Sequence, residues 1–365
     1  MRVKLKDITK FSKGTQINGK NLIDDGAYPY LNGGINPSGK WNEFNVAENT
    51  VTISEGGNSS GYVNYMNEAF WCGAHCYYLY DGPKNSKYLY YALKSQQERL
   101  FRIRSGACMP NIKKSDLGNF IIEYEEDETR QEEVVKVLEK CELLIEDYNK
   151  KLALLDEAVR ARFVEMFGDE NNSKGWEIVN IEDVANVQVG VVIKPSQYYT
   201  DQYNGIKAFR SLNIGNGYIK DDDWVYFSKE GNKKNKKSIL STNDVLVVRS
   251  GAPGTACVVT SEYAGSNAID VIIAHPDFQK VDSHYLCTYT NMPHGKSQII
   301  EGTGGAAQQH FNVGKYNKLK LMLPPLEYQK QYVKFLEEID KSRLRELLAI
   351  KQIKLLLNDS WLLFY

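Results

Sequence analysis

The stretch VKLKDITKFSKGTQI, residues 3–17, returns 176 residues later as VNIEDVANVQVGVVI, residues 179–193. The copies share apolar positions, an aspartate, a glycine and a closing isoleucine: Val3, Leu5, Asp7, Ile8, Gly14 and Ile17 match Val179, Ile181, Asp183, Val184, Gly190 and Ile193. A repeat of this kind fixes the architecture before any single motif is weighed. The sequence therefore predicts two copies of one unit, joined head to tail.

Later features keep the same order in both copies, with loop-sized insertions between them. The matches pair 28–32 with 206–214, 51–53 with 245–247, 56–57 with 250–251, 88–89 with 285–286, and the glycine-rich 105–107 with 302–306. Short apolar runs such as Val245-Leu246-Val247-Val248, broken by Gly, Asn, Pro and Ser, indicate strands and turns. Each copy should therefore open with a strand-rich α+β module, after which Gln131 or Gln329 opens a long helical pattern.

The helical pattern of the first copy has the spacing of a coiled-coil seam. Apolar residues follow a four-three alternation at Val134, Leu138, Cys141, Ile145, Tyr148, Leu152, Leu155 and Val159. This alternation is typical of a helix that packs against another helix, and it extends over roughly 38 Å at 1.5 Å per residue. Gly168 and the polar segment 169–175 should end the helix and form a linker.

A second helix is expected from about Leu326 to Asn358, with an apolar side made of Leu336, Ile339, Leu347, Ile350 and Leu357. Its seam is weaker, because Arg343 stands where a heptad residue would be. Isolated seams of this length would expose too much apolar surface, so we expect the two helices to pair as an antiparallel coiled coil. The alternative is that each helix packs only on its own module.

The predicted fold class is therefore α+β, with two strand-rich modules in a tandem pseudo-repeat, each followed by a long helix. The expected extents are 1–128 for the first module, 129–168 for its helix, 169–175 for the linker, 176–325 for the second module and 326–365 for the second helix.

Composition and charge agree with a packed protein and leave its partner open. Of the 365 residues 42% are hydrophobic and 25% charged, and the net charge of -1 offers no overall attraction to a polyanion. Basic residues nevertheless cluster at 229–237 and 99–114, and acidic residues cluster at 123–133. Segregated charge fits a protein with one face toward phosphate and another toward a protein partner, although solvated surface charge is the plain alternative.

Several classes of protein are disfavoured by what the sequence lacks. No window of 18 apolar residues and no signal-peptide core occur, so we expect a cytoplasmic protein without membrane contact. The six cysteines are scattered, which is not a disulfide framework. Cys72, His75 and Cys76 could ligate zinc, but their spacing fits no standard site and alternation along a strand explains them better. We predict neither a metal nor a cofactor.

No catalytic residues can be assigned from motifs. An adenine methyltransferase needs Asn or Asp before Pro-Pro-Tyr or Pro-Pro-Phe, whereas here Leu323 precedes Pro324-Pro325 and Leu326 follows. The acidic and lysine residues of a nuclease strand, a Walker loop, a nucleophile elbow and a zincin helix are also not recognisable. A stand-alone nuclease or methyltransferase is therefore disfavoured, and we expect a protein that is not itself an enzyme.

The order of module, helix, module and helix resembles the specificity subunit of Type I restriction-modification systems along the whole chain. The stretches that carry the resemblance are WEIVNIEDV at 176–184 and LPPLEYQ at 323–329. The family's junction typically reads Pro-Pro and then Glu-Gln, whereas this chain has Glu327-Tyr328-Gln329, and the first junction, 125–131, lacks the prolines.

The resemblance implies that each module is a target-recognition domain that reads one half of a split site in double-stranded DNA. It further implies that the paired helices set the spacing between half-sites and dock two modification (methyltransferase) subunits, with restriction (endonuclease and translocase) subunits as further partners. A duplicated protein-interaction scaffold without DNA binding is the alternative.

Candidate DNA contacts are Arg, Lys, Asn, Gln, Ser and His side chains on turns, because these types bind base edges and phosphates. In the first module they are Asn32, Asn36, Lys40, Asn58, Ser59, Ser60, Arg102, Arg104 and Lys113. In the second they are Arg210, Asn213, Lys233, Lys234, Arg249, Ser250, Gln308, Gln309 and His310. Arg249 stands out because the Gly and Pro after it predict a tight turn that could lift it toward a groove. It could equally be a rim charge, and Gln308, Gln309 and His310 could cap a turn.

Overall fold

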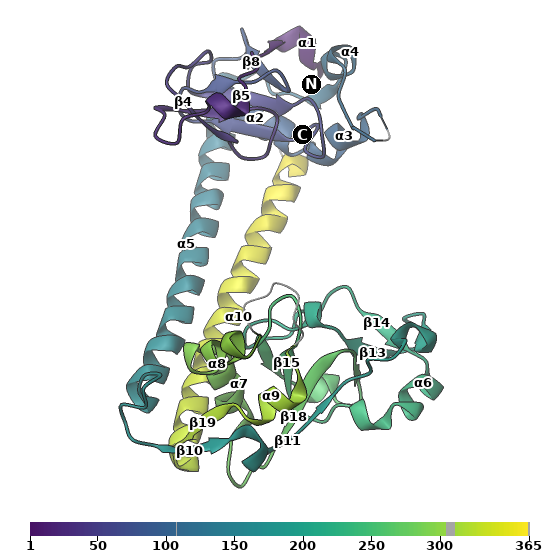
Figure 1. Ribbon diagram of the computed structural model, residues 1–365. Helices are drawn as coiled ribbons and strands as arrows, with labels where there is room; N and C mark the ends of the chain where they lie inside the picture. The colour runs from purple at the N-terminus through teal and green to yellow at the C-terminus, as the bar shows by residue number, and fades with distance from the viewer. Residues whose placement is uncertain (107, 304–310, 364–365) are drawn as a thin grey trace. The chain divides into compact units, whose positions relative to one another are not determined.

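A computed structural model describes residues 1–106, 108–303 and 311–363 of the chain (Figure 1). It contains two compact units, one of Met1–Lys150 with Glu346–Tyr365 and the other of Lys151–Arg345. Two long helices, α5 (Glu128–Phe167) and α10 (Leu326–Leu363), each contribute residues to both units.

The first unit is built on three small sheets. The four-stranded sheet has the order β2 (Lys10–Lys13), β8 (Cys76–Tyr80), β5 (Thr50–Ser54) and β6 (Val63–Met66). A second sheet has the order β4 (Gly39–Trp41), β3 (Tyr28–Leu31) and β7 (Trp71–Cys72), and β1 (Arg2–Lys4) pairs with β9 (Ile121–Glu123). The helices are α1 (Leu5–Ile8), the 3-10 turn η1 (Gly19–Asn21), α2 (Ser86–Lys94), α3 (Gln97–Arg102) and α4 (Lys114–Gly118).

The second unit repeats this plan with longer loops. Its first sheet has the order β11 (Ala185–Val189), β18 (Val271–Pro276), β15 (Val245–Val248) and β16 (Ala256–Val258). Its second has the order β12 (Tyr199–Thr200), β14 (Val225–Phe227), β13 (Ile206–Phe209) and β17 (Asn267–Ala268), and β10 (Glu177–Asn180) pairs with β19 (Lys320–Leu323). The helices are α6 (Lys229–Lys234), α7 (Ser283–Asn291), α8 (Pro293–Thr303) and α9 (Val313–Asn317), with 3-10 turns η2 (Ile181–Asp183), η3 (Pro195–Tyr198), η4 (Ser211–Asn213), η5 (Lys236–Ser238) and η6 (Ser261–Tyr263).

Strand connectivity confirms the predicted tandem repeat. The sheet order β2-β8-β5-β6 recurs as β11-β18-β15-β16, and the parallel pair of β3 and β7 recurs as β13 and β17. The repeated glycines have the same structural role in both copies. A side chain at Gly14 would clash with the carbonyl of Cys72, and a side chain at Gly190 would clash with the carbonyl of Ala268. Each glycine therefore lets its strand approach a partner backbone closely.

Each unit has its own apolar core. In the first, Val51, Ile53, Leu79 and Tyr88 pack with Leu138 of α5. In the second, the apolar run Val245–Val248 is buried along its whole length, because Val245 and Val247 face one cluster and Leu246 and Val248 another. This strand lies between β16 and β18 with both faces covered, so its residues are continuously apolar rather than alternating.

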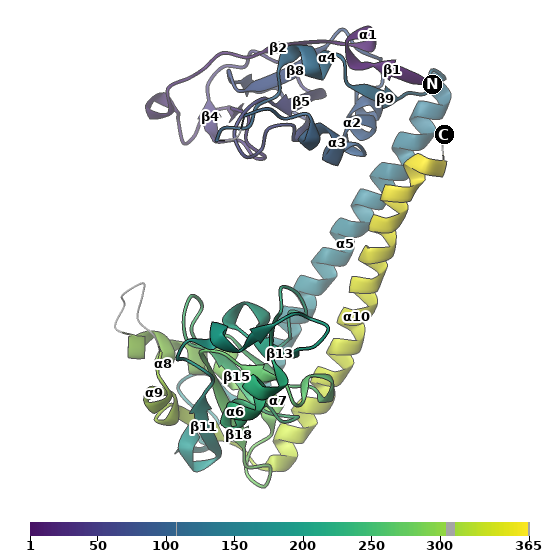
Figure 2. The same cartoon turned by 90° about the vertical axis from the view of Figure 1, so that its right-hand side faces the viewer.

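The two long helices run antiparallel and lie side by side, as predicted (Figure 1, Figure 2). In the second unit the Tyr332 hydroxyl donates to the Val159 carbonyl at 3.3 Å, and the Tyr332 ring packs on Phe163. In the first unit Leu357 packs on the core that contains Leu138. Between residues 141 and 159 the four-three positions of α5 are all partly buried, as expected for a seam. Gly168, at φ +91°, ends this helix.

One expected seam position of the second helix differs in the structure. Leu347 is 53% exposed, so its place in the second seam was wrong, and the four-three positions of α10 are instead Leu336, Ile339, Arg343, Glu346 and Ile350. In the first repeat stretch, strand β1 ends at Lys4, because Leu5 begins a one-turn helix in which the Thr9 amide donates to the Leu5 carbonyl at 3.1 Å.

Candidate nucleic-acid interface

In the first unit, polar loops that lie far apart in the sequence are joined by hydrogen bonds. The Ser59 hydroxyl donates to the Gly33 carbonyl at 2.6 Å, and the Gly57 amide donates to the Pro110 carbonyl at 2.9 Å. Arg104 reaches the Asn58 carbonyl at 3.4 Å and packs over the Phe101 ring. The structure therefore brings the predicted candidates of segments 32–36, 58–60 and 102–104 together on one set of loops.

The candidate side chains of the first unit fall into two groups. Ser60 is buried and donates to the Glu55 carbonyl at 2.8 Å, and Asn32 accepts from the His75 amide at 3.2 Å. Together with Ser59 and Arg104, these side chains hold the loops. The exposed group has no hydrogen bond or ion pair from its side chains to other described residues: Asn36, Lys40, Asn58, Arg102 and Lys113. A bound ligand could contact these five side chains without breaking a hydrogen bond or an ion pair to another described residue.

An acid-centred cluster beside these loops was not predicted as part of the site. Glu55, mostly buried, pairs with Lys13 at 2.6 Å and with His75 at 3.4 Å. Burial and the nearby Glu55 carboxylate raise the pKa of Tyr77 to about 12. His75 entered the sequence analysis only as a zinc candidate, since nothing local in the sequence announces its pairing with Glu55. Within residues 1–106, 108–303 and 311–363 no three His, Cys, Asp or Glu side chains gather as a metal site.

In the second unit the lysines at 229–237 form a patch on α6 and η5. Lys229, Lys233, Lys234, Lys236 and Lys237 are all exposed, and no carboxylate of the described chain pairs with them. The fully buried Asn267 fixes the backbone under the patch. Its side-chain amide donates to Asn232 at 2.7 Å, and its side-chain oxygen accepts from the Ser238 hydroxyl at 2.7 Å. A rigid base thus presents five cationic side chains to solvent.

Other candidates of the second unit are tied into the fold. Asn213 is fully buried and accepts from the Arg210 amide at 2.9 Å, while the Arg210 guanidinium pairs with Asp223 at 3.4 Å. Arg249 is mostly buried, where it donates to the Phe311 carbonyl at 3.1 Å and pairs with Asp270. Ser250 is half-buried beside it, and Gln308, Gln309 and His310 lie outside the described residues.

Below the 210–224 loop, Lys207 sits in a cage of aromatic and acidic groups. Its ammonium is 2.7 Å from Asp221 and lies over the rings of Trp224 and Tyr263, at 4.8 and 4.9 Å. Hydrogen bonds from Lys207 and Trp224 lower the pKa of Asp221, and burial together with this carboxylate raises the pKa of Tyr263. The cage fixes the loop that carries Arg210 and Asn213.

A family model described as the Type I restriction modification DNA specificity domain matches residues 1–156 and 173–355. Over 149 residues, 40% of each chain, the sequence is 36% identical to a type I specificity subunit of Mycoplasma pneumoniae. It is 22% identical over 271 residues to the specificity subunit of the type I restriction enzyme MjaVIII from Methanocaldococcus jannaschii, which is 69% of this chain and 63% of that protein. The chain thus spans less than two thirds of the length of these relatives.

Solved structures share the fold of the whole chain. The crystal structure of a type I restriction-modification S subunit from M. genitalium is similar with a TM-score of 0.59 and 18% identity, over 98% of this chain and 94% of that one. A chain from a study of the assembly and conformational transition of the type I system is similar with a TM-score of 0.60 and 13% identity, over 98% and 95%. None of the helices within the described residues has the length and the apolar composition of a membrane span.

Proposed function

Because this chain belongs to the family of type I restriction modification DNA specificity domains, we propose that it is the sequence-specific DNA-recognition subunit of a type I restriction-modification complex. The observation that carries the proposal is that the family match covers both copies of the repeat, residues 1–156 and 173–355. Two equivalent modules on one chain suit a DNA site with two halves. We take residues 1–128 and 176–325 as the two target-recognition domains.

Contacts to DNA come from the exposed, unpaired candidates. Asn36 and Asn58 have free amides suited to base edges, and Arg102 and Lys113 carry charges suited to phosphate. Lys40 adds a further contact in the first module, and Lys233 and Lys234 do so in the second. The tied side chains, Asn32, Ser59, Ser60, Arg104, Arg210, Asn213 and Arg249, position the loops. Ser250, Gln308, Gln309 and His310 stay candidates for the second half-site.

The methyl transfer and the cleavage belong to partner subunits in this proposal, and the chain itself only selects the site. The paired helices α5 and α10 dock two modification subunits and set the gap between half-sites. Their outward faces carry exposed leucines, among them Leu143, Leu154, Leu344 and Leu355, which a monomeric protein rarely leaves uncovered. A complex that modifies the cell's own DNA works in the cytoplasm.

The proposal is tested by methylation mapping. The chain is expressed with the modification subunits encoded beside it, in a host that lacks other such systems, and the genome is sequenced by a method that reads methylated bases. A methylated motif in two parts, present with the chain and lost without it, is expected. A complex that forms and yet leaves the same methylation with and without the chain would refute the proposal.

A protein-interaction scaffold is the competing function, and its test is salt-dependent DNA binding. A recogniser that neutralises several phosphates loses affinity steeply as salt rises, because counterions are released on binding. A scaffold bound to the same partners would give no such dependence.

A further inference from the structure

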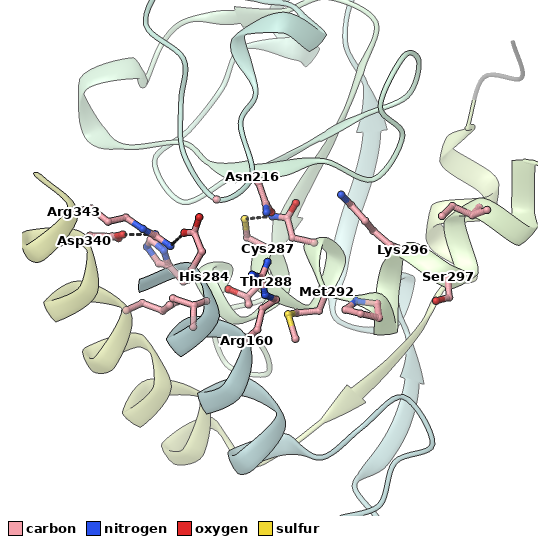
Figure 3. A pocket seen from close by; sticks show the side chains of 17 residues that line it. Arg160, Asn216, His284, Cys287, Thr288, Met292, Lys296, Ser297, Asp340 and Arg343 are labelled. Atoms are coloured by element: carbon pink, nitrogen blue, oxygen red, sulfur yellow. Dashed lines mark hydrogen bonds and ion pairs between the residues drawn. The ribbon is translucent and has the colours of Figure 1, made fainter. Parts of the chain in front are cut away.

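A cavity of about 480 Å³ opens in the second unit, between α7, α8 and the facing parts of the two long helices (Figure 3). Its floor is apolar, with Val159 of α5, Leu336 of α10 and Met292 at the end of α7. Its volume lies within the range of sites that bind small molecules or anchor side chains.

The charges around this cavity do not cancel. Both acids of the lining, Asp156 and Asp340, are engaged by Arg343, which pairs with Asp340 at 3.1 Å and also with Asp156. Arg160 and Lys296 also line the cavity, and their side chains have no ion pair or hydrogen bond to any described residue. Two free cations thus face an apolar floor.

The tandem repeat shows what the first copy has at the equivalent place. Helices α2 and α7 have nine residues each, begin after side-chain caps from Asn85 and Asp282, and bury Tyr88 and Tyr285 completely. Aligned in this way, Tyr90 and Tyr91 of the first copy stand where the second has Cys287 and Thr288.

In the first copy these tyrosines fill the space against the long helix. The Tyr91 hydroxyl donates to Glu142 of α5 at 2.7 Å, and the Tyr90 and Tyr91 rings pack on each other at 5.0 Å. Lys87 lies over the Tyr65 ring at 4.5 Å and is 3.7 Å from Glu139, so its charge is engaged. Cys287 and Thr288 are much smaller, and the cavity of the second copy is the space that they leave.

We propose that this cavity is a docking seat, in the second copy only, for an acidic segment with an apolar or aromatic anchor on one of the two modification subunits. The floor receives the anchor, and Arg160 and Lys296 pair with the acidic groups beside it. Because the first copy fills the equivalent place with Tyr90 and Tyr91, the two modification subunits bind unequally. The inference rests on the proposed function, in which α5 and α10 form the docking surface.

The test is the stoichiometry of the complex, measured by native mass spectrometry as modification subunit is titrated into the full chain. One variant, Thr288→Tyr, introduces the residue of the first copy. A second, Arg160→Glu with Lys296→Glu, reverses the two free charges on the cavity wall, and it keeps the test decisive if the first variant fails to fold. Lys174→Glu with Lys220→Glu is the matched control, because it reverses two exposed charges of the second unit that neither line the cavity nor belong to the proposed DNA contacts.

Wild type and control should bind two modification subunits. Both cavity variants should keep one bound modification subunit. They should bind the second subunit about tenfold more weakly than wild type, equivalent to about 1.4 kcal/mol. Equal binding of two subunits by folded cavity variants, or equal loss of both, would overturn the inference. The inference would also be overturned if the cavity variants bound both modification subunits like wild type and changed only the affinity for ATP, measured by calorimetry. That result would mark the cavity as a site for a small anion. A wild-type chain that binds no modification subunit would instead refute the proposed function itself.

Discussion

Exposed lysines without acidic partners are the clearest sign of a phosphate contact at the scale of single residues. Lys233 and Lys234 belong to five such lysines on α6 and η5, whose backbone is fixed by the buried Asn267. Neighbouring like charges repel one another slightly in the free protein, and a polyanion removes that repulsion. The gain is electrostatic, so it carries affinity and not sequence choice.

Replacing Lys233 and Lys234 by Gln should therefore weaken DNA binding by the assembled complex without changing the methylated motif. The slope of log affinity against log salt should become shallower by about two, roughly one for each lost phosphate contact. Fluorescence anisotropy over a salt series measures it. Lys318→Gln is the control, because the Lys318 ammonium already pairs with Glu182. An unchanged slope would remove this patch from the interface.

Arg249 should matter for stability more than for base contact. Its guanidinium holds the Phe311 carbonyl and Asp270, so Arg249→Ala would leave both without their partner. We expect a loss of about 2 kcal/mol in the free energy of unfolding, read from a denaturant titration. Arg102→Ala, at an exposed position, should cost less than about 0.5 kcal/mol. If Arg249→Ala were as stable as wild type but failed to recognise its site, the arginine would be a base reader instead.

The candidate site residues were chosen by residue type and by their place on expected turns, and such a choice has a physical limit. Asn58 and Ser60 are polar residues two positions apart, yet Asn58 is exposed and Ser60 is buried against the Glu55 carbonyl. Which of two nearby polar residues faces solvent depends on loop conformation, and loop conformation depends on long-range hydrogen bonds such as that from Gly57 to Pro110. A local pattern cannot supply that information.

At the scale of elements, α5 was well predicted because nearly all its seam positions are apolar. The seam of α10 was harder to place, because Arg343 and Glu346 occupy seam positions and the apolar Leu347 lies beside them. The structure shows why Arg343 is tolerated at a seam position: it forms an ion pair with Asp156 on the opposite helix. A charged residue in a seam is understood only with its partner in view.

A matched pair of substitutions separates the two possible seams of α10. Ile350 is 7% exposed and Leu347 is 53% exposed. Ile350→Ala should cost about 2 to 3 kcal/mol because it opens a cavity in the helix pair, whereas Leu347→Ala should cost less than about 0.5 kcal/mol. Denaturant unfolding of both variants measures the difference. Equal costs would contradict the seam described above.

At the scale of the whole molecule, the tandem architecture could be predicted because a duplication leaves marks over the full length of the chain. The repeat 3–17 and 179–193 carried that prediction, and the matching sheet orders confirm it. The cavity of the second copy could not be predicted from the sequence. It arises where Cys287 and Thr288 stand in place of tyrosines, and whether that space stays open depends on how α7 packs against α10.

Lengthening the helix pair should change the spacing of the half-sites and leave the bases read unchanged. A heptad added after Leu152, with a second after Leu344, keeps the pair of Asp156 and Arg343 intact and the seams in phase. The insertion adds roughly 10 Å, or about three base pairs. Methylome mapping gives the readout. Unchanged spacing in a folded, active variant would show that the helices do not set it.

In the proposed function, each module reads one half of a two-part site. The most direct measurement exchanges residues 1–128 for the equivalent module of another specificity subunit and maps methylated bases across the host genome with the same modification subunits. If each module reads one half-site, one half of the methylated motif should change while the other half and the gap stay the same. A motif changed in both halves, or in neither, would contradict it.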